Sequence, residues 1–508
     1  MSAADVAASS PLGLRYASGP GRWVLLATVL GSAMASIDAT VVGIALPAIG
    51  HDFNSGLATL QWVVTAYTLT LAGLLLFAGA LGDKYGRKKI FVYGIVWFAV
   101  ASVLCGIAPD APFLIAARAV QGIGAALLTP GSLAIIEASF RPEDRGRAIG
   151  AWSGLSGVGS AIGPFLGGWL IQAVSWRLIF AINLPLAVLV VAVSLRHVPE
   201  SRDPQATGRL DTVGGVLVTL GLVGLTYGLI EGPTVGWTTP APLTALIAGC
   251  LVLAAFVAWE RRSAEPMMPL SLFRSAQFSG ANVATFAVYG AMGGALFLLP
   301  IELIQVAHYT ALQAGVALLP VTFIMLALSA RSGALAARIG PRLQMTVGPL
   351  IVAAGLALFV RIGLSGNYLT EVLPAVLVFG FGLAVNVAPL TATVLAAVPA
   401  EHAGMASAVN NDVARAASLI AVAVLPAAAG LTGASYLHRN VFSAGFHTAS
   451  LISAGLCVFG GAVAAVTIRN PKAAERAAPA QQLLSCGLDA PPAPPVAAAA
   501  PAAGGTAQ

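Results

Sequence analysis

The sequence has very few charged residues for its length. Only 9% of its 508 residues are Asp, Glu, Lys or Arg, whereas a soluble protein uses about 25% to cover a surface that faces water. Hydrophobic residues make up 58% of the chain, and the mean hydropathy is +0.87. A water-soluble globular fold is therefore excluded, and most of the chain must face lipid.

Cysteine, lysine and histidine are also scarce. The four cysteines have no spacing typical of a disulfide framework or a metal site, because Cys105, Cys250 and Cys457 fall within hydrophobic runs and Cys486 lies near the end. None of the four lysines follows a glycine, so the phosphate-binding loop G-x-x-x-x-G-K-[ST] is absent. The six histidines are scattered, and no sizeable soluble domain is present. We expect no metal, cofactor or nucleic-acid partner, and a membrane-embedded enzyme or sensor is a remote alternative.

Fourteen hydrophobic runs can be read along the chain. Each is close to the ~20 residues that a helix needs to cross a bilayer core of about 30 Å. A β-barrel would instead show strands of about ten alternating residues, which the unbroken run 350–360 contradicts. We predict an all-α membrane protein with helices near 22–49, 58–82, 90–108, 112–136, 147–173, 178–196, 210–231, 242–259, 278–304, 312–330, 344–362, 371–398, 404–431 and 444–468.

The positions of lysine and arginine predict the topology, because basic residues stay on the cytoplasmic side of membrane proteins. If both termini lie inside, 21 of the 26 Lys and Arg residues fall in internal segments. The other five, which lie within spans or outside, are Arg118, Arg177, Arg361, Arg415 and Arg439. An odd number of spans would destroy this sorting. We expect a multi-pass protein of the cytoplasmic membrane with both termini in the cytoplasm.

The two halves of the chain resemble each other at a separation of about 254–258 residues. The repeated segments are 79–87 and 333–342, 122–126 and 380–384, and 142–146 and 399–404. Such a repeat indicates two similar bundles related by an axis along the membrane normal, with two inserted helices, or six plus two plus six. The predicted parts are a disordered tail at 1–21, a six-helix bundle at 22–196, linkers with inserted helices 7 and 8 at 197–277, a second bundle at 278–468 and a disordered Ala- and Pro-rich tail at 469–508.

A basic turn follows the second predicted span. Gly79, Asp83, Gly86 and Arg87 lie in a segment that resembles the loop 2–3 motif G-x-L-a-D-r-x-G-r-k of the major facilitator superfamily. Asp83 stands at the C-terminal end of a helix, where the helix dipole makes a carboxylate unfavourable by roughly 0.3–1 kcal/mol. The resemblance implies that Asp83 contacts the start of span 13, near Gly404, and so acts as a latch that closes the cytoplasmic side. The alternative is a solvated charge that only sets the topology.

Charged residues inside predicted spans are the next candidates. An arginine within a span costs about 2.5–3.5 kcal/mol on insertion scales, so Arg118 is a functional candidate unless it snorkels to the outer interface. Arg118, Gln121 and the glycines that follow resemble the R-x-x-Q-G-x-G motif of proton antiporters, which implies a role in proton coupling.

Asp38 lies about 24 Å along the first span, at ~1.5 Å per residue. The segment 37–47 resembles the L-D-x-T-i-v-n-v-A-L-P segment of the fourteen-helix drug:proton antiporters, a family within the same superfamily. A buried carboxylate has a raised proton affinity, so Asp38 can exchange a proton for a cationic substrate. The alternative is a structural hydrogen bond to a neighbouring helix.

The fifth span is rich in glycine. Three of its glycines recur every four residues and so line one face, which lets another helix approach closely, and its proline favours a kink. The segment resembles the G-P-x-x-G-G antiporter motif of exporters, which implies export, while ordinary small-residue packing is the alternative. The residues concerned are Gly154, Gly159, Gly163, Pro164, Gly167 and Gly168.

Span 13 departs from the family pattern. The family tends to show glycines after N-N-t-x-R, and here they are missing. Asn411, Asp412 and Arg415 are candidate polar residues of a cavity. Because Asp412 and Arg415 are three positions apart, a spacing at which helical side chains meet, we favour a structural ion pair, with a substrate or proton role as the alternative.

The resemblance covers residues 22–468 and includes the run 175–185, similar to W-R-w-i-F-x-i-N-x-P. It implies proton-driven export of small amphipathic compounds (drugs, antibiotics or native metabolites) by alternating access, in a monomer embedded in lipid. A proton-coupled transporter of a lipid or a specific metabolite, or an uptake permease, is the alternative. The sequence does not predict the substrate.

Overall fold

The structure is a computed structural model and describes residues 13–203, 210–399, 402–433 and 438–470, with residues 160 and 161 described for their backbone only. Within these ranges it contains fourteen helices, some of them in two consecutive pieces, that are long and apolar enough to cross a membrane. The protein is therefore a multi-pass, all-α membrane protein, as predicted. The two tails and Cys486 fall largely or wholly outside the described residues.

The helices group as six, two and six. The first bundle contains α2 (Gly19–Asp52), α3 (Leu57–Tyr85), α4 (Arg87–Gly106), α5 (Ala111–Ser139), α6 (Pro142–Ala173) and a span made of α7 (Leu178–Ala181) and α8 (Asn183–His197). The inserted helices are α9 (Thr212–Val235) and α10 (Pro240–Glu260). The short 3-10 helix η1 (Leu270–Arg274) leads into the second bundle.

The second bundle has more interruptions than the first. Its helices are α11 (Ala276–Ile301) continued by the π-helical η2 (Glu302–Val306), α12 (Ala311–Ala317) followed by α13 (Leu319–Ile339), α14 (Arg342–Leu358) with η3 (Phe359–Arg361), η4 (Tyr368–Val372) with α15 (Leu373–Ala396), α16 (Ala403–Ala428) and α17 (Arg439–Thr467). These pieces join into the six spans that the hydrophobic runs predict.

Local sequence explains where several helices begin and end. The Asp110 side chain accepts a hydrogen bond from the third residue of α5, and Thr310 forms a capping box with Gln313 at the start of α12. Gly86 and Gly340 end α3 and α13 with φ of +119° and +88°, a conformation that favours glycine. These two glycines occupy equivalent places in the repeat, so the same helix ends twice for the same reason.

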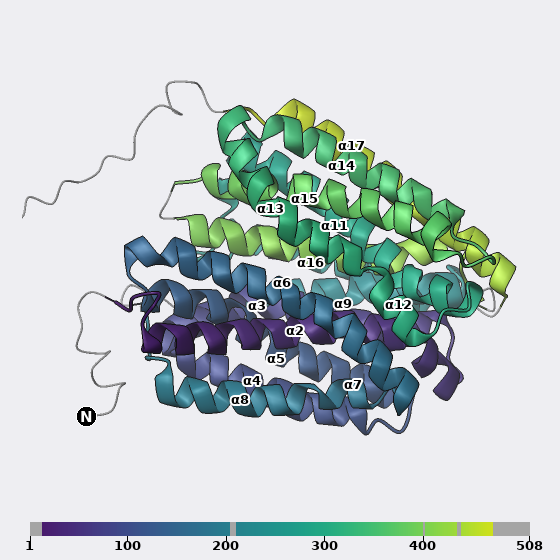
Figure 1. The fold of residues 1–508 in the computed structure, drawn as a ribbon, viewed down its shortest axis with the longest axis horizontal. Helices are drawn as coiled ribbons and strands as arrows, with labels where there is room; N and C mark the ends of the chain where they lie inside the picture. Colours follow the sequence, from purple (N-terminus) through teal and green to yellow (C-terminus); the bar gives the residue numbers. More distant parts are fainter. Residues whose placement is uncertain (1–12, 204–209, 400–401, 434–437, 471–508) are drawn as a thin grey trace, which may run out of the picture. The chain divides into compact units, whose positions relative to one another are not determined.

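The repeat is confirmed by the packing of the helices. In the first bundle α2 packs against α6 and α8, and α5 against α3 and α4. In the second bundle α11 packs against α16 and α17, and α15 against α13 and α14. Figure 1 shows the first bundle in purple to blue and the second in green to yellow. The halves therefore share one neighbour pattern.

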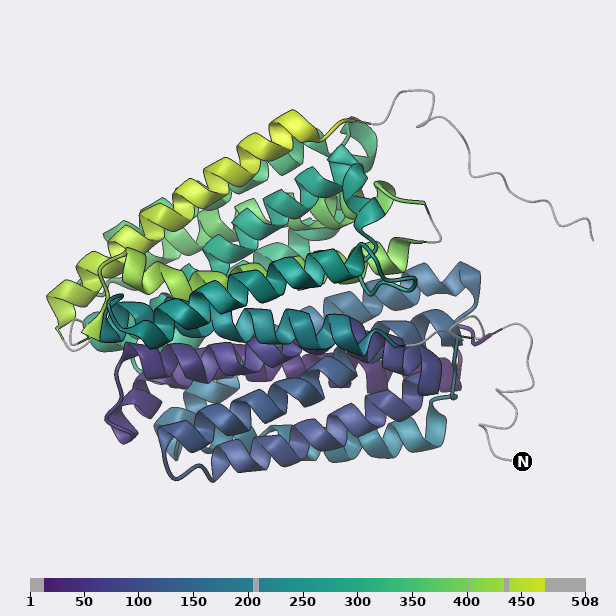
Figure 2. The same cartoon turned by 180° about the vertical axis from the view of Figure 1, so that it is seen from behind.

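The inserted pair lies along the junction of the two bundles. Helix α9 packs against α3 of the first bundle and α16 of the second, and α10 packs against α9. Figure 2 shows the pair in teal between the two bundles. The Trp62 indole of α3 donates a 2.8 Å hydrogen bond to Glu231 of α9, so a polar contact as well as apolar packing fixes α9 to the first bundle.

The hydrophobic core is shared at one end of the bundles and divided at the other. One cluster combines the second half of α2 and the first half of α3 with residues of α11, α14 and α15, and so includes both bundles. The first half of α2 and the second half of α3 belong to a cluster confined to the first bundle, and a third cluster is confined to the second half of the chain. The bundles are therefore packed together at the end where α3 begins.

Direct contacts between the bundles lie at that same end. The Gln61 amide of α3 donates a 2.6 Å hydrogen bond to the Val422 carbonyl of α16, and Gln61 is only 5% exposed. A Cβ on Gly315 of α12 would lie 2.2 Å from the Pro164 carbonyl oxygen of α6, so α12 and α6 touch through their backbones.

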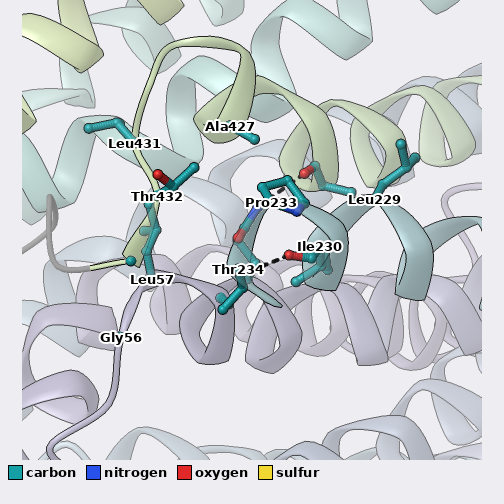
Figure 3. A pocket seen from close by; sticks show the side chains of 13 residues that line it. Gly56, Leu57, Leu229, Ile230, Pro233, Thr234, Ala427, Leu431 and Thr432 are labelled. Carbon is teal, nitrogen blue, oxygen red and sulfur yellow. Dashed lines mark hydrogen bonds between the residues drawn. The ribbon is translucent and has the colours of Figure 1, made fainter. Parts of the chain in front are cut away.

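A small cavity of about 60 Å³ lies beside Gln61, between the ends of α3, α9 and α16. Figure 3 shows its lining, in which Leu57, Pro233 and Ala427 represent the three helices. The Thr234 hydroxyl there is already bonded to the Ile230 carbonyl. The cavity is apolar and has room for little more than a few waters.

The predicted disordered tail at 1–21 is wrong for its last part. Residues 1–12 lie outside the described residues, but Leu14 forms a backbone bridge with Phe140, and the Tyr16 amide donates to the Asp144 carboxylate at 2.9 Å. The Tyr16 ring also stacks on the Arg147 guanidinium. Helix α2 already begins at Gly19. The segment 13–18 is thus held by the α5–α6 junction, which lies about 125 residues away along the chain.

Candidate functional site

Asp38 lies in the middle of α2 and is buried, with 3% of its surface exposed. One carboxylate oxygen accepts a hydrogen bond from Arg118 Nη1 at 2.5 Å, and the other accepts one from Gln121 Nε2 at 2.8 Å. Both partners belong to α5, which packs against α2. The structure therefore brings together the three residues that the sequence proposes for proton coupling.

Arg118 does not snorkel to an interface. Its side chain is 1% exposed, and it makes two further hydrogen bonds inside the bundle, since Nε donates to the Val63 carbonyl at 3.2 Å and Nη1 also donates to Gln121 at 2.6 Å. The guanidinium lies 4.3 Å from the centre of the Tyr67 ring, a cation–π contact. Contacts on two helices and an aromatic face thus offset the cost of the buried charge.

Asn183 and Ser102 complete this network, and the sequence reasoning missed both. Asn183 Nδ2 donates to Asp38 at 3.1 Å and to the Ser102 hydroxyl at 2.9 Å, and Ser102 donates to the Phe180 carbonyl at 2.9 Å. Asn183 lies in the run 175–185 that carries the family resemblance, where an amide inside a hydrophobic run was the available signal. We name Asp38, Arg118, Gln121, Asn183 and Ser102 the Asp38 network.

The Asp38 network contains one negative and one positive charge, and it is closed to solvent. An ion pair in a low-dielectric interior is held strongly once it is formed, but desolvation makes the loss of either partner expensive. Protonation of Asp38 would remove its charge and leave Arg118 without a counter-ion.

The glycines of α6 face α2 beside Asp38. A Cβ added to Gly159 would lie 2.7 Å from the Cβ of Ala33, and one added to Gly163 would lie 3.2 Å from the Cα of Ile37. A Cβ added to Gly167 would lie 2.6 Å from the side chain of Val41. The four-residue spacing therefore forms the close helix contact that the sequence predicts. The same helix face positions the turn of α2 that carries Asp38.

Two other residues of this motif face the second bundle. A Cβ on Gly168 would lie 2.7 Å from the Leu312 Cα of α12, and the Pro164 carbonyl lies against Gly315 of the same helix. Gly154, near the other end of α6, has nothing within 4 Å of the position that a Cβ would take. Among the glycines of this motif, those in the C-terminal half of α6 are therefore in close contact with α2 or α12, and Gly154 is not.

The basic turn is fixed by bonds within the first bundle. Arg87 Nη2 pairs with Asp83 at 2.7 Å across the α3–α4 junction, and Arg87 Nη1 reaches the Ala134 carbonyl of α5 at 3.5 Å. Glu200 accepts hydrogen bonds from the backbone amides of the second and third residues of α4. A Cβ on Gly86 would lie 2.8 Å from the Glu200 carboxylate, which leaves room for glycine only.

The latch between Asp83 and the start of α16 stays a prediction. In this structure the carboxylate of Asp83 is bonded to Arg87. Gly404, in the first turn of α16, has nothing within 4 Å of the position of a Cβ. Gly79, the first residue of the motif, meets only Pro130 at ordinary contact distance. The contacts described for Asp83 and Gly404 do not join the two bundles, whereas the latch requires such a contact.

The expected ion pair between Asp412 and Arg415 is not formed. The three ion pairs among the described residues are Arg118–Asp38, Arg87–Asp83 and Arg177–Asp52. Asp412 Oδ1 and Arg415 Nε are buried and have no hydrogen-bond partner within the described part of the chain. The spacing brings two helical side chains near each other, but it does not fix the rotamers that a bond requires.

Asn411 is exposed and bonded only within its own helix, since its amide donates to the Ser407 carbonyl at 2.9 Å. Asn410, its neighbour, instead joins α16 to α11, because its amide donates to Asn282 and Thr285 at 3.0 and 2.8 Å. Helix α16 therefore keeps an exposed amide and two incompletely bonded charged groups along its first half.

Comparison with known proteins agrees with this fold. The family model described as Major Facilitator Superfamily matches residues 28–423. The chain belongs to the major facilitator superfamily, whose members are transporters and not enzymes.

Particular relatives are antibiotic-resistance proteins. The multidrug resistance protein Stp of Mycobacterium tuberculosis is 37% identical over 402 residues, which are 79% of this chain and 74% of the relative. The puromycin resistance protein pur8 of Streptomyces alboniger is 36% identical over 426 residues, 82% and 84% of the two chains. The tetracenomycin C resistance and export protein of Streptomyces glaucescens is 34% identical over 79% of this chain and 74% of the relative.

Solved structures share the fold at lower identity. An inward-facing, unoccupied bacterial homologue of the human lysosomal transporter Spinster matches with a TM-score of 0.62 at 17% identity, over 89% of this chain and 97% of that one. The inward-open xylose transporter XylE from E. coli matches with a TM-score of 0.60 at 15% identity, with the same coverage. At this identity the likeness establishes the fold alone.

Proposed function

We propose that this protein exports small amphipathic compounds across the cytoplasmic membrane in exchange for protons. The observation that carries the proposal is the Asp38 network, a closed carboxylate and guanidinium in the interior of a membrane-spanning bundle. Relatives whose names include multidrug resistance, puromycin resistance and tetracenomycin C export support the substrate class. A drug, an antibiotic or a native metabolite of similar chemistry fits this class equally.

Asp38 is the residue at which proton and substrate compete. It lies 19 residues from the start of α2 and 14 from the end, so it is about 28 Å and 21 Å from the two ends at ~1.5 Å per residue. A proton that enters down a potential of 100 mV contributes about 2.3 kcal/mol. This free energy suffices for more than tenfold accumulation of an uncharged compound on the far side.

Alternating access follows from the two ways in which the bundles can meet. If both termini lie in the cytoplasm, as the distribution of 21 of the 26 basic residues favours, the packed end near Gln61 is the outer one. The present conformation then faces inward. We infer that closure of the inner end brings Asp83 to the start of α16 near Gly404, while α6 and α12 separate at Gly168.

Residues in the first half of α16 are the groups that we propose the second bundle contributes to the substrate cavity. Asn411 is exposed, and Asp412 and Arg415 each keep a buried atom without a partner. Polar groups in a span that lack partners are expensive and are typical of substrate or ion pathways. We therefore retain these three residues as candidate cavity groups. The glycines of α6, by contrast, serve the proposal through packing, since they position α2.

The test measures transport in everted membrane vesicles whose interior is more acidic than the outside solution. The probes are ethidium, puromycin and tetracenomycin C. Wild type should accumulate at least one of them, and dissipating the gradient should abolish this. Asp38→Asn should abolish accumulation, whereas the matched control Asp52→Asn, on the same helix but 43% exposed, should retain it. Normal accumulation by Asp38→Asn would refute the role of Asp38, and uptake in right-side-out cells would favour the permease alternative.

A further inference from the structure

Two carboxyl groups converge at the base of the α9–α10 hairpin, outside both six-helix bundles. Asp211 directly precedes α9, and Glu260 is the last residue of α10. Asp211 Oδ2 and Glu260 Oε1 lie 2.6 and 2.8 Å from the single position that a Cβ on Gly214 would take. The two oxygens are therefore directed at one point, and the missing side chain of Gly214 leaves that point free.

The orientation of each carboxyl group is fixed by its other oxygen. Asp211 Oδ1 accepts hydrogen bonds from the Gly214 amide at 2.8 Å and from the Trp259 indole at 2.9 Å. Glu260 Oε2 accepts one from the Met268 amide at 3.0 Å. Neither group can turn its converging oxygen away without breaking these bonds.

The converging oxygens have no hydrogen-bond partner among the residues that the structure describes. Asp211 Oδ2 and Glu260 Oε1 are both buried and unpaired, and Glu260 is only 3% exposed. Two ionised carboxylates that share a buried site repel each other, and one of them binds a proton in compensation. A proton on either oxygen would convert two facing acceptors into one O–H···O hydrogen bond.

Charged groups nearby do not neutralise the pair. Arg261 and Arg274 line a pocket of about 620 Å³ beside Glu260, but no hydrogen bond or ion pair among the described residues joins either to the two carboxyl groups. Helix α3 presents Phe77 to this end of α9, and α16 meets α9 through Leu419. Arg209 lies outside the described residues and enters the test below.

We propose that Asp211 and Glu260 form a proton-binding site that locks the base of the inserted hairpin. With one proton shared between them, the hairpin base and the segment that follows α10 are held together. When that proton leaves to water, the two charges repel and the base loosens. Because α9 packs against α3 and α16, this lock acts on the junction of the two bundles. The proposal is independent of Asp38 and of the direction of transport.

The test measures the thermal unfolding midpoint of the full-length protein in lipid nanodiscs between pH 5 and pH 9. The lock is complete at low pH and is lost as the pH rises, so the wild-type midpoint should fall towards pH 9. Glu260→Gln should flatten this fall, because an amide donates permanently to Asp211. The matched control Glu265→Gln, at an exposed residue five positions further on, should keep the wild-type profile. A wild-type profile in Glu260→Gln would overturn the proposal.

Further variants test whether the pH dependence comes from a proton held between the two oxygens. Gly214→Ala places a methyl group between them and should lower the midpoint and remove its pH dependence. In the control Gly215→Ala, the added methyl group lies at an ordinary contact distance of 3.6 Å from Phe77. This control should keep both the wild-type midpoint and its pH dependence. Tryptophan emission should shift with pH in wild type and not in Trp259→Phe, since this indole is bonded to Asp211. If Arg209→Gln removes the pH dependence of the unfolding midpoint, the proposed shared proton is wrong and an ion pair between Arg209 and the carboxyl groups explains the dependence.

Discussion

The Asp38–Arg118 pair makes the most precise prediction about stability. Asp38→Ala would leave a guanidinium that is 1% exposed without its counter-ion, and Arg118→Ala would leave a carboxylate that is 3% exposed. Breaking a buried pair from one side costs about 3–5 kcal/mol, mainly because an uncompensated charge stays buried. The double variant leaves no buried charge at this site.

The expected free energies of unfolding are therefore strongly non-additive. We expect each single variant to lose about 3–5 kcal/mol and the double variant to lose about as much as one single variant, which corresponds to a coupling of about 3–5 kcal/mol. The Arg177–Asp52 pair is the internal control. It has a similar separation of 2.6 Å, but its side chains are 36% and 43% exposed. Its coupling should be at most about 1 kcal/mol.

The measurement is reversible unfolding of the purified protein in mixed detergent micelles, with a complete double-mutant cycle for each pair. Comparison of the two cycles removes effects of the detergent that are common to both. Losses that add up in the Asp38–Arg118 cycle, or equal coupling in the buried and the exposed cycle, would refute the reasoning that links burial to the strength of this pair.

Two other predictions follow from helix contacts. Gly163→Ala forces a methyl group to within 3.2 Å of the Ile37 Cα, so it should destabilise the protein by about 1–3 kcal/mol and lower transport. The control Gly154→Ala lies in open space and should be neutral or stabilise the protein by up to about 1 kcal/mol. Equal effects of the two variants in unfolding assays would contradict the close contact. Gln61→Leu removes the hydrogen bond from the Gln61 amide to the Val422 carbonyl, worth about 0.5–1.5 kcal/mol. Distances between spin labels on α3 and α16, at the end where α3 begins, should therefore increase. Unchanged distances would show that this hydrogen bond does not hold the bundles together.

Much of the fold could be predicted because the bilayer imposes a strong constraint on the sequence. A span must be long and apolar, so each of the fourteen runs stands out, and charges within runs stand out for the same reason. Asp38 and Arg118 were visible in this way. That they touch each other was not visible, because 80 residues separate them and only the packing of α5 on α2 brings them together.

The missed and mistaken details have a different origin. Asn183 carries no charge, so its presence in a span costs too little to attract notice. The Asp412–Arg415 pair was expected from spacing, but the rotamers are set by neighbours on other helices. The contact of Leu14 with Phe140 is a backbone pairing over a long sequence distance, for which side-chain composition gives no signal.

The central claim is that Asp38 exchanges a proton for substrate. The most direct measurement adds a compound that wild type exports to the purified protein in weakly buffered solution, at a pH acidic enough to protonate Asp38 and break its ion pair with Arg118, and records proton release with a pH-sensitive dye. We predict release from wild type and from Asp52→Asn on binding, and none from Asp38→Asn. Binding to Asp38→Asn with the same release of protons would contradict the account.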